Sequence, residues 1–261
     1  MDYFEKIENP PASDLAWNIP EKKQGTVNVI GGNRQSFNAE VKISEFLNAN
    51  YPIQNLHIVL PDALKTKLPP LPNFVFLHST DSGSFASAED LSQAINFADF
   101  NLLLGDLSKN TVTGKTVASA CISSEKPLLI TRDAVDLITD QALDRLLMNE
   151  NLIFLASMPQ LIKLFRSVYY PKVLLLSQSL IQVAEVLHKF TLSFPVTIIT
   201  LHNNQILIAK DGVVKAIALE KSGHSPLTFW SGELAAKILA LNLYNPNQFI
   251  NATISAIMVN N

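Results

Sequence analysis

The sequence predicts an α/β protein whose mostly parallel central sheet is covered by helices on both faces. Short apolar runs of strand length alternate with longer segments of helical period along most of the chain. This alternation is typical of a layered fold in which a helix follows each strand. Late in the chain, an Asp-Gly pair between two apolar runs indicates a tight β-hairpin.

The predicted strands are short runs rich in branched and aromatic residues, and the predicted helices lie between them. The strands are Val27–Ile30, Leu56–Leu60, Phe74–Leu77, Leu102–Leu104, Pro127–Ile130, Leu152–Leu155 and Val196–Thr200. The helices are Ala39–Asn48, Ala86–Ala98, Thr113–Ser123, Asp133–Met148, Pro159–Val168 and Leu176–Phe190. A capping box with proline in the first turn, Ser157-Met158-Pro159-Gln160, marks the start of one of them.

The last part of the chain departs from this alternation. Gln205–Ala209 and Val213–Ala218 flank the turn Lys210-Asp211-Gly212 and form the predicted hairpin. Two closing helices are expected over Gly232–Leu243 and Pro246–Met258. Because nothing marks a second domain, we expect one domain over residues 1–261, with residues 1–24 as an N-terminal extension.

Composition narrows the function classes. The formal net charge is −3 and no Lys/Arg cluster appears, so a nucleic-acid partner is not expected. No apolar run reaches the ~20 residues of a membrane span, and the lone Cys121, expected as a small buried hydrophobe, allows no internal disulfide. We therefore expect a soluble, cytoplasmic protein. The 48% hydrophobic content makes a homo-oligomer plausible, with the closing helices as the expected contact.

Two turns are the candidate sites. Gly31-Gly32-Asn33 follows a predicted strand, so the backbone there could approach a ligand at the carboxyl end of the sheet. A plain tight turn into the next helix is the alternative. Ser231-Gly232-Glu233 opens a closing helix, where unpaired N–H groups and the helix dipole could hold phosphate. An acid favoured electrostatically in a first turn is the alternative for Glu233.

In order along the chain, these turns and several stretches between them resemble the ADP- or ATP-dependent NAD(P)H-hydrate dehydratases, which are ribokinase-like proteins. The resemblance covers about Lys23 to Ile257. Gly31 to Ala39 is similar to the family's Gly-Gly-Ser opening, with Asn38 in place of a glycine. Gly105-Asp106 stands where the family has a glycine-rich strand end, and Asp133 matches an aspartate that follows the next strand. For Asp133, a helix N-cap is the alternative.

Other family positions are changed. The family's Thr-Pro-His-x-x-Glu is Leu155 to Gln160 here, without the histidine and the carboxylate. Its Lys-Gly-Ala turn, which touches the nucleotide phosphates, is Thr200-Leu201-His202. The C-terminal Gly-Thr-Gly-Asp turn resembles Trp230 to Glu233, and Gly223 precedes it. An indole thus replaces a glycine, and a glutamate replaces the catalytic aspartate.

The resemblance implies a ribokinase-like three-layer α/β/α sandwich with a late β-hairpin. It further implies dehydration of hydrated NADH or NADPH with ADP or ATP and Mg²⁺. Glu233 would be the base, while Ser231, Gly232, Thr200, His202 and Gly223 would border the nucleotide phosphates. The substrate side would comprise Gly31, Gly32, Asn33, Asn38, Gly105, Asp106 and Asp133. The alternative is a catalytically degenerate relative that binds a nucleotide or a partner protein, or serves as a structural subunit.

Overall fold

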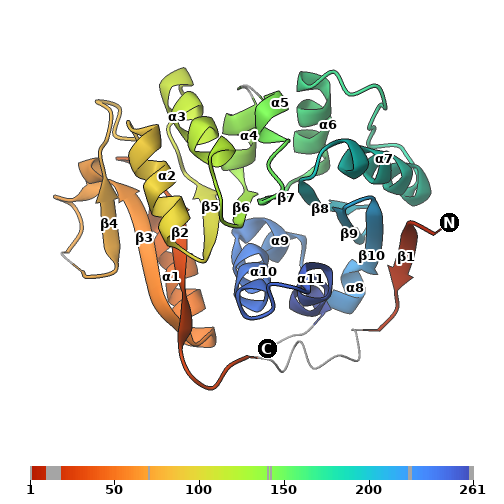
Figure 1. The fold of residues 1–261 in the computed structure, drawn as a ribbon, viewed down its shortest axis with the longest axis horizontal. Helices are drawn as coiled ribbons and strands as arrows, with labels where there is room; N and C mark the ends of the chain where they lie inside the picture. The colour runs from red at the N-terminus through yellow and green to blue at the C-terminus, as the bar shows by residue number, and fades with distance from the viewer. Residues whose placement is uncertain are drawn as a thin grey trace.

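One twisted sheet runs through the whole protein, with helices on both of its faces (Figure 1). The computed structural model describes residues 2–9, 19–69, 71–139, 141, 143–222 and 225–258. The strand order in the sheet is β1-β10-β9-β8-β7-β6-β5-β2-β3-β4. All neighbouring strands run parallel except in the pairs β8–β9 and β9–β10. The predicted α/β class with a mostly parallel sheet is confirmed.

The bounds of the elements follow the predicted order. The strands are β1 Phe4–Ile7, β2 Gln24–Gly31, β3 Ile53–Pro61, β4 Phe74–Leu77, β5 Phe100–Gly105, β6 Leu128–Thr131, β7 Leu152–Leu155, β8 Thr197–His202, β9 Gln205–Lys210 and β10 Val213–Ala218. The helices are α1 Asn38–Asn50, η2 Asp62–Leu64 (a 3-10 turn), α2 Ala88–Phe97, α3 Thr111–Ile122, α4 Asp133–Thr139, α5 Leu143–Leu146, α6 Met158–Ser167, α7 Leu180–Ser193, α8 Leu219–Ser222, α9 Pro226–Ser231, α10 Glu233–Tyr244 and α11 Phe249–Met258.

The sheet separates two apolar cores. Helices α2 to α7 pack on one face and α1, α10 and α11 on the other. Successive residues of the central strands alternate between these cores: Leu103 belongs to the first, and Leu102 and Leu104 to the second. Because both faces are covered, the strands are apolar throughout rather than alternating with polar residues. Cys121 lies fully buried in α3, as expected for a small hydrophobe.

The late hairpin forms as the Asp-Gly pair predicts. Asp211 and Gly212 both have positive φ, 50° and 75°, which is the backbone that a two-residue turn of this hand needs. Strand β1 was not predicted, and it lies inside the expected N-terminal extension. Its sequence, Phe-Glu-Lys-Ile, is too short and too charged to stand out, and it forms by pairing with β10 at the sheet edge.

Three predicted helices were wrong in extent. The expected helix Asp133–Met148 is divided into α4 and α5. The Thr139 hydroxyl donates to the carbonyl of Val135 at 2.6 Å. Two residues later, Gln141 N–H donates to Ile138 O at 3.0 Å, which is the spacing of a tighter turn than an α-helix has.

The other two helices begin later than predicted. Helix α7 starts after Ser179, which forms a capping box with Gln182. Helix α11 starts at Phe249 rather than Pro246.

The closing helices are core elements rather than an exposed surface. Most of α10, and Ala252 to Ile257 of α11, are buried against the sheet and against each other. Their apolar residues are therefore used inside the protomer, which removes the reason for expecting a subunit contact there. In the described part of the chain, no helix combines the length and hydropathy of a membrane span.

Candidate functional site

The carboxyl ends of β2 and β5 mark the point where the strand order reverses. From β2 the chain moves outward through β3 to β4, then returns to β5 on the other side of β2. In open parallel sheets, ligands bind in the crevice at such a reversal. The first residue of the predicted glycine turn, Gly31, pairs with Gly105 across this point. The structure thus brings together two candidate residues that lie far apart in the sequence.

Both residues of this pair, Gly31 and Gly105, must be glycine. A Cβ atom on Gly31 would lie 2.5 Å from the carbonyl oxygen of Gly105 and closer still to the carboxyl of Glu40. Gly105 has φ 121° and Gly32 has φ 81°, backbone that side chains rarely adopt. Asn38 has no such constraint, because it is simply the first residue of α1. The change from the family's glycine at Asn38 therefore requires no unusual backbone.

A cavity of about 780 Å³ opens beside this step, above the carboxyl ends of β5 to β7. It is lined by Asp106, Lys109, Arg132, Asp133, Ser157, Gln160, Leu227, Trp230 and Ser231. Three of the predicted site residues, Asp106, Asp133 and Ser231, thus share one cavity. No sequence pattern pointed to Lys109. Arg132 lies two residues after the predicted strand Pro127–Ile130 and directly after β6, on the edge where open α/β sheets bind ligands.

A polar network fixes the floor of the cavity. The Asp133 carboxylate accepts the Asp106 backbone N–H at 3.0 Å, and the Arg132 guanidinium donates to the Asp106 carboxylate at 3.2 Å. The Asn33 side-chain amide donates to the Asp106 carbonyl at 2.5 Å. Asp106 and Arg132 both have positive φ, 53° and 54°. Because such backbone costs energy in residues other than glycine, the network holds a strained turn in place.

The capping box of α6 belongs to the same network. The Gln160 side chain accepts the Ser157 N–H at 2.9 Å and donates to the carbonyl of Arg132 at 2.8 Å and to the Asp136 carboxylate at 2.7 Å. The predicted box is confirmed. In this chain, Gln160 stands where the family has glutamate, and its amide cross-links the strand ends.

Helix α10 begins at the edge of the cavity. Gly232 is its N-cap with φ 101°, and a Cβ there would approach Leu104 of β5 to 2.7 Å. Trp230, at the end of the unpredicted short helix α9, lines the cavity wall and is half-buried. The indole therefore borders the space without filling it. Glu233 is exposed and does not line the cavity; the Glu233 N–H lies 3.3 Å from Ser231 Oγ.

Glu40 is a buried acid that sequence reasoning missed. It lies in the first turn of α1 with no exposed surface, and neither carboxyl oxygen has a hydrogen-bond partner among the described residues. The pKa of Glu40 is raised to about 8, and burial is the main cause. Its own backbone N–H and Arg132 lower this pKa, and Asp106 and Asp133 raise it. The available signal was its spacing, because Glu40, Ile43 and Leu47 share one helix face.

The predicted phosphate-contacting residues of β8 point into the protein. Thr200 is fully buried, and its hydroxyl has no hydrogen-bond partner among the described residues. His202 is also buried, with Nε2 2.8 Å from the carbonyl of Gln178. Neither lines the cavity. Gly223 lies outside the described residues, so its role stays a prediction.

Comparison with solved structures identifies the architecture. A ribokinase-like superfamily protein from Enterococcus faecalis superposes with a TM-score of 0.64 at 16% identity, covering 99% of this chain and 86% of that one. The protein has a ribokinase-like fold. An ADP/ATP-dependent NAD(P)H-hydrate dehydratase from Bacillus subtilis, co-crystallized with ATP/Mg²⁺, gives 0.61 at 13% identity, covering 97% and 87%.

A hydroxyethylthiazole kinase from Pyrococcus horikoshii gives a TM-score of 0.55 at 14% identity, covering 93% of this chain and 80% of that one. No protein-family model and no curated protein matches the chain. The similarity therefore extends to the fold shared by these kinases and the dehydratase.

Proposed function

We propose that the protein is a divergent, nucleotide-dependent enzyme of the NAD(P)H-hydrate dehydratase type, with its substrate in the cavity beside α10. One observation carries this proposal: Asp106, Asp133 and Ser231, chosen from the sequence by family resemblance, line the same cavity. That cavity extends from Asp106, next to the sheet reversal, over the carboxyl ends of β5 to β7, and open α/β folds bind ligands at this edge.

The cavity has the chemistry that a phosphorylated, ring-bearing ligand needs. Lys109 and Arg132 bring positive charge beside Asp106 and Asp133, with Arg132 paired to Asp106. Helix α10 begins just after Ser231 at the cavity edge, so the positive end of its dipole favours an anion there. The half-buried indole of Trp230 offers a flat apolar wall for a ring. Among the described residues, no group of three or more acidic, histidine or cysteine side chains is placed to hold a metal ion. Mg²⁺ would therefore arrive with the nucleotide phosphates.

In this proposal, Glu233 accepts the proton of the substrate hydroxyl as that oxygen takes the phosphoryl group. The phosphoryl group comes from ADP or ATP, which leaves one phosphate shorter. The carbon–oxygen bond of the phosphorylated substrate then breaks, phosphate leaves with the electron pair, and the neighbouring ring carbon releases a proton to solvent as the double bond forms. The amides of Ser231 and Gly232 hold the phosphate. Gly31, Gly32 and Asn33 lie outside the cavity lining, next to Asp106, and border the substrate from there. Because Glu233 is exposed beside the cavity rather than within its lining, its carboxylate must turn inward when substrate binds.

A second candidate is a relative that binds the ligand without turning it over. The observation that favours it is the inward orientation of Thr200 and His202. Where the family places a lysine against the nucleotide phosphates, β8 here presents no positive charge to the cavity. Phosphoryl transfer would then lack part of its charge balance.

The experiment measures ADP and ATP binding by calorimetry and loss of NADH hydrate in a coupled absorbance assay. Turnover that Glu233→Gln abolishes, with binding retained, supports the enzyme, and Glu220→Gln serves as the matched exposed-acid control. Binding without turnover in the unsubstituted protein supports the second candidate. If neither nucleotide binds nor raises the melting temperature, both candidates are wrong.

A further inference from the structure

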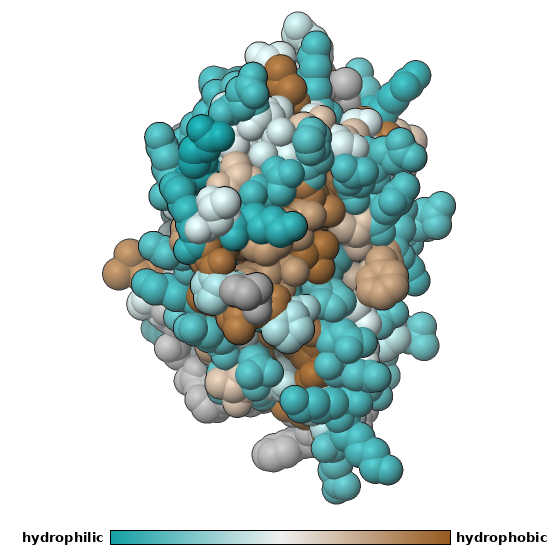
Figure 2. Space-filling model, turned by 90° about the vertical axis from the view of Figure 1, so that its left-hand side faces the viewer, coloured by the Kyte–Doolittle hydropathy of each residue, from teal (hydrophilic) through white to brown (hydrophobic). Residues whose placement is uncertain are grey.

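Helix α2 leaves part of the sheet uncovered beside β3 and β4. A cavity of about 510 Å³ lies there, on the face of the sheet that carries α2. Its floor is formed by Asn28 of β2, His57 and Val59 of β3, and Val75 and Leu77 of β4, and one wall is formed by α2. Figure 2, which views the β3–β4 side of the molecule, shows apolar side chains gathered in a hollow among hydrophilic ones. A cavity of this size and composition suits a small molecule.

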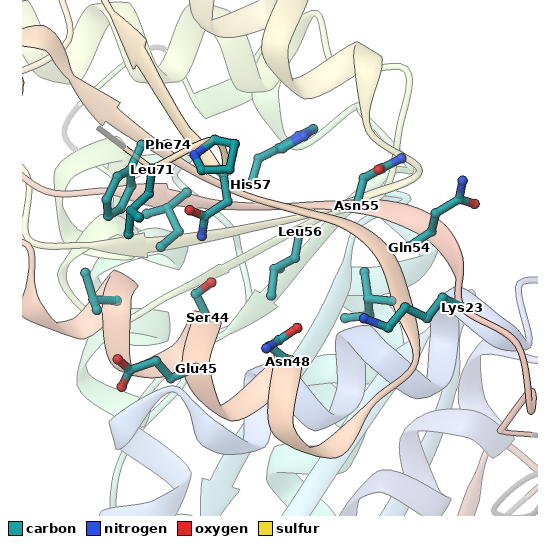
Figure 3. Close-up of a pocket in the computed structure, with 15 residues that line it drawn as sticks. Lys23, Ser44, Glu45, Asn48, Gln54, Asn55, Leu56, His57, Leu71 and Phe74 are labelled. Atoms are coloured by element: carbon teal, nitrogen blue, oxygen red, sulfur yellow. The ribbon is translucent and has the colours of Figure 1, made fainter. Parts of the chain in front are cut away.

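A groove on the other face of the same strands has a different character. It measures about 470 Å³ and lies between β3 and α1 (Figure 3). The polar side chains around it belong mostly to exposed residues, namely Lys23, Glu45, Asn48, Gln54 and Asn55. Water satisfies such groups, so these residues point to no ligand. The cavity beside α2 is different because a polar residue in its floor is buried.

Asn28 places a hydrogen-bond acceptor in that floor. The residue is only 2% exposed. Its Nδ2 donates to Ala94 O at 2.7 Å and to the Oδ1 of Asn101 at 3.1 Å. Two acceptors around one end of the amide show that this end carries the nitrogen. The other end, Oδ1, has no hydrogen-bond partner among the described residues.

The neighbouring Asn101 rules out the reverse orientation of this amide. Asn101 is fully buried on β5, opposite Asn28, and its own Nδ2 donates to Ile95 O at 2.9 Å. Its Oδ1 can therefore only accept. Because Nδ2 and Oδ1 of Asn28 point in different directions from one planar group, Oδ1 is turned away from β5, toward β3 and the cavity. A ligand with an N–H group would supply the donor that this buried oxygen lacks.

Two aromatic rings border the same cavity. The half-buried imidazole of His57 and the phenyl ring of Phe97 have centroids 6.2 Å apart and planes inclined by 29°. Phe97 is the last residue of α2 and is 72% exposed. An exposed phenyl ring at the mouth of a partly apolar cavity offers a surface on which a flat ring stacks.

The charge around the cavity disfavours an anionic ligand. Among the described residues that line it, Asp90 is the one acid, and none is a lysine or an arginine. The cavity at the carboxyl edge is the opposite case, because Lys109 and Arg132 line it. With acceptors at Asn28 and Asp90, the cavity beside α2 suits a ligand that donates hydrogen bonds.

We propose that the cavity beside α2 binds a small flat heteroaromatic ring of nucleobase size that carries an amino group and no phosphate. The ring stacks on Phe97 and His57, the amino group donates to Asn28 Oδ1, and Asp90 accepts a further N–H. The described residues lining this cavity and those lining the carboxyl-edge cavity do not overlap, so this site is separate from the one in the proposed function.

The first test titrates the full chain with adenine, which has an amino group and neither charge nor phosphate, while backbone amide signals are followed by NMR. Saturable shifts are expected around the cavity beside α2, with a dissociation constant below about 1 mM. No saturation up to about 5 mM overturns the proposal. Shifts centred on Trp230 and Ser231 overturn it as well, because they place adenine at the carboxyl edge. A mass that doubles with concentration, without adenine binding, would assign the surface to a second copy instead.

Substitutions then locate the stacking surface. Phe97→Ala should weaken adenine binding about tenfold, because stacking on the ring is lost. Leu192→Ala is the matched control, since Leu192 is 63% exposed on another helix and does not line the cavity. Trp230→Gly should also leave adenine binding unchanged, which separates this site from the carboxyl-edge cavity. Equal affinities of the Phe97 and Leu192 variants contradict the proposal.

The hydrogen bond to Asn28 has its own test. Purine, the same ring system without the amino group, should bind the unsubstituted protein about tenfold more weakly than adenine. Asn28→Leu should abolish this preference, whereas Phe97→Ala should weaken both ligands and keep it. The ratio of the two affinities separates a lost acceptor from a general loss of packing, which would weaken both ligands alike. An equal affinity for adenine and purine in the unsubstituted protein rules out the assigned role of Asn28.

Discussion

The two halves of the carboxyl edge of the sheet differ in how much of a ligand site they keep. At β2, β5 and β6, glycines make room for close backbone contacts, and Asp106, Arg132 and Asp133 form a network around an open cavity. At β8, Thr200 and His202 turn inward, and His202 bonds to a neighbouring loop. In the first half, polar contacts hold the positive-φ backbone of Asp106 and Arg132. In the second half, Thr200 and His202 are buried like ordinary core residues.

Under the proposed function, this contrast means that the substrate side of the site keeps its polar contacts and the nucleotide side at β8 does not. A strained, polar turn costs stability, so it is expected to persist only where it contributes to binding. The β8 segment carries no comparable cost. The following substitutions challenge or refine this view.

The largest effect on stability is expected where Gly31 pairs with Gly105. Gly31→Ala would drive a methyl group against the Gly105 carbonyl and the Glu40 carboxyl, and should lower the free energy of unfolding by about 4 kcal/mol. Denaturant unfolding measures the change. Gly114→Ala is the control, since its new Cβ meets only the end of the flexible Gln141 side chain. Similar stability of both variants would show that the surroundings of Gly31 are not tightly packed.

The second effect is a pH dependence caused by Glu40. In the unfolded chain this carboxyl ionises near 4.5, whereas in the folded protein it keeps its proton to about pH 8. The folded state binds the extra proton in this window, so the free energy of unfolding should fall as pH rises from about 4.5 to 8.

Glu40→Gln removes that titration and should flatten the fall by about 3 kcal/mol. Chemical denaturation at several pH values measures the slope. Glu45→Gln, an exposed acid on the same helix, should leave it unchanged. An unchanged slope in Glu40→Gln would mean that water reaches the carboxyl and keeps its pKa near normal.

A smaller effect is expected at the network itself. Asp133→Ala leaves the Asp106 N–H without its acceptor and should cost about 2 kcal/mol of stability. Asp133→Asn keeps an acceptor oxygen and should cost less. If the alanine variant unfolds like the unsubstituted protein, solvent satisfies this N–H and the turn is not held as described.

The smallest effect on stability is expected at Trp230. Because the indole is half-buried at the cavity wall, Trp230→Gly should cost about 1 kcal/mol. If the cavity binds a ring-bearing ligand against the indole, Trp230→Gly should lower the affinity for that ligand, measured by calorimetry. A rise in affinity would instead indicate that the indole obstructs the family's anion site.

Much of the fold could be predicted from the sequence because local rules fixed it. The buried runs from Val27–Ile30 to Val196–Thr200, the Asp211-Gly212 turn and the Ser157 capping box each carry their signal in a few neighbouring residues. Strand β1 could not be predicted, because its pairing with β10 depends on residues about two hundred positions away. The break after Thr139 was not predicted, because the helical pattern of Asp133–Met148 runs on without a proline or glycine to mark an end.

For the site, the sequence by itself determined which backbone positions tolerate close approach and which polar residues follow each strand. Gly31 and Ser231 were found from the turns that contain them, and Asp106 and Asp133 from the family resemblance. Asp106, Asp133 and Ser231 line the cavity. Only the tertiary structure decided that Glu40 is buried without a partner, that His202 faces inward and that Glu233 stays exposed. Orientation and burial depend on what packs against a residue from distant parts of the chain, and no local pattern contains that information.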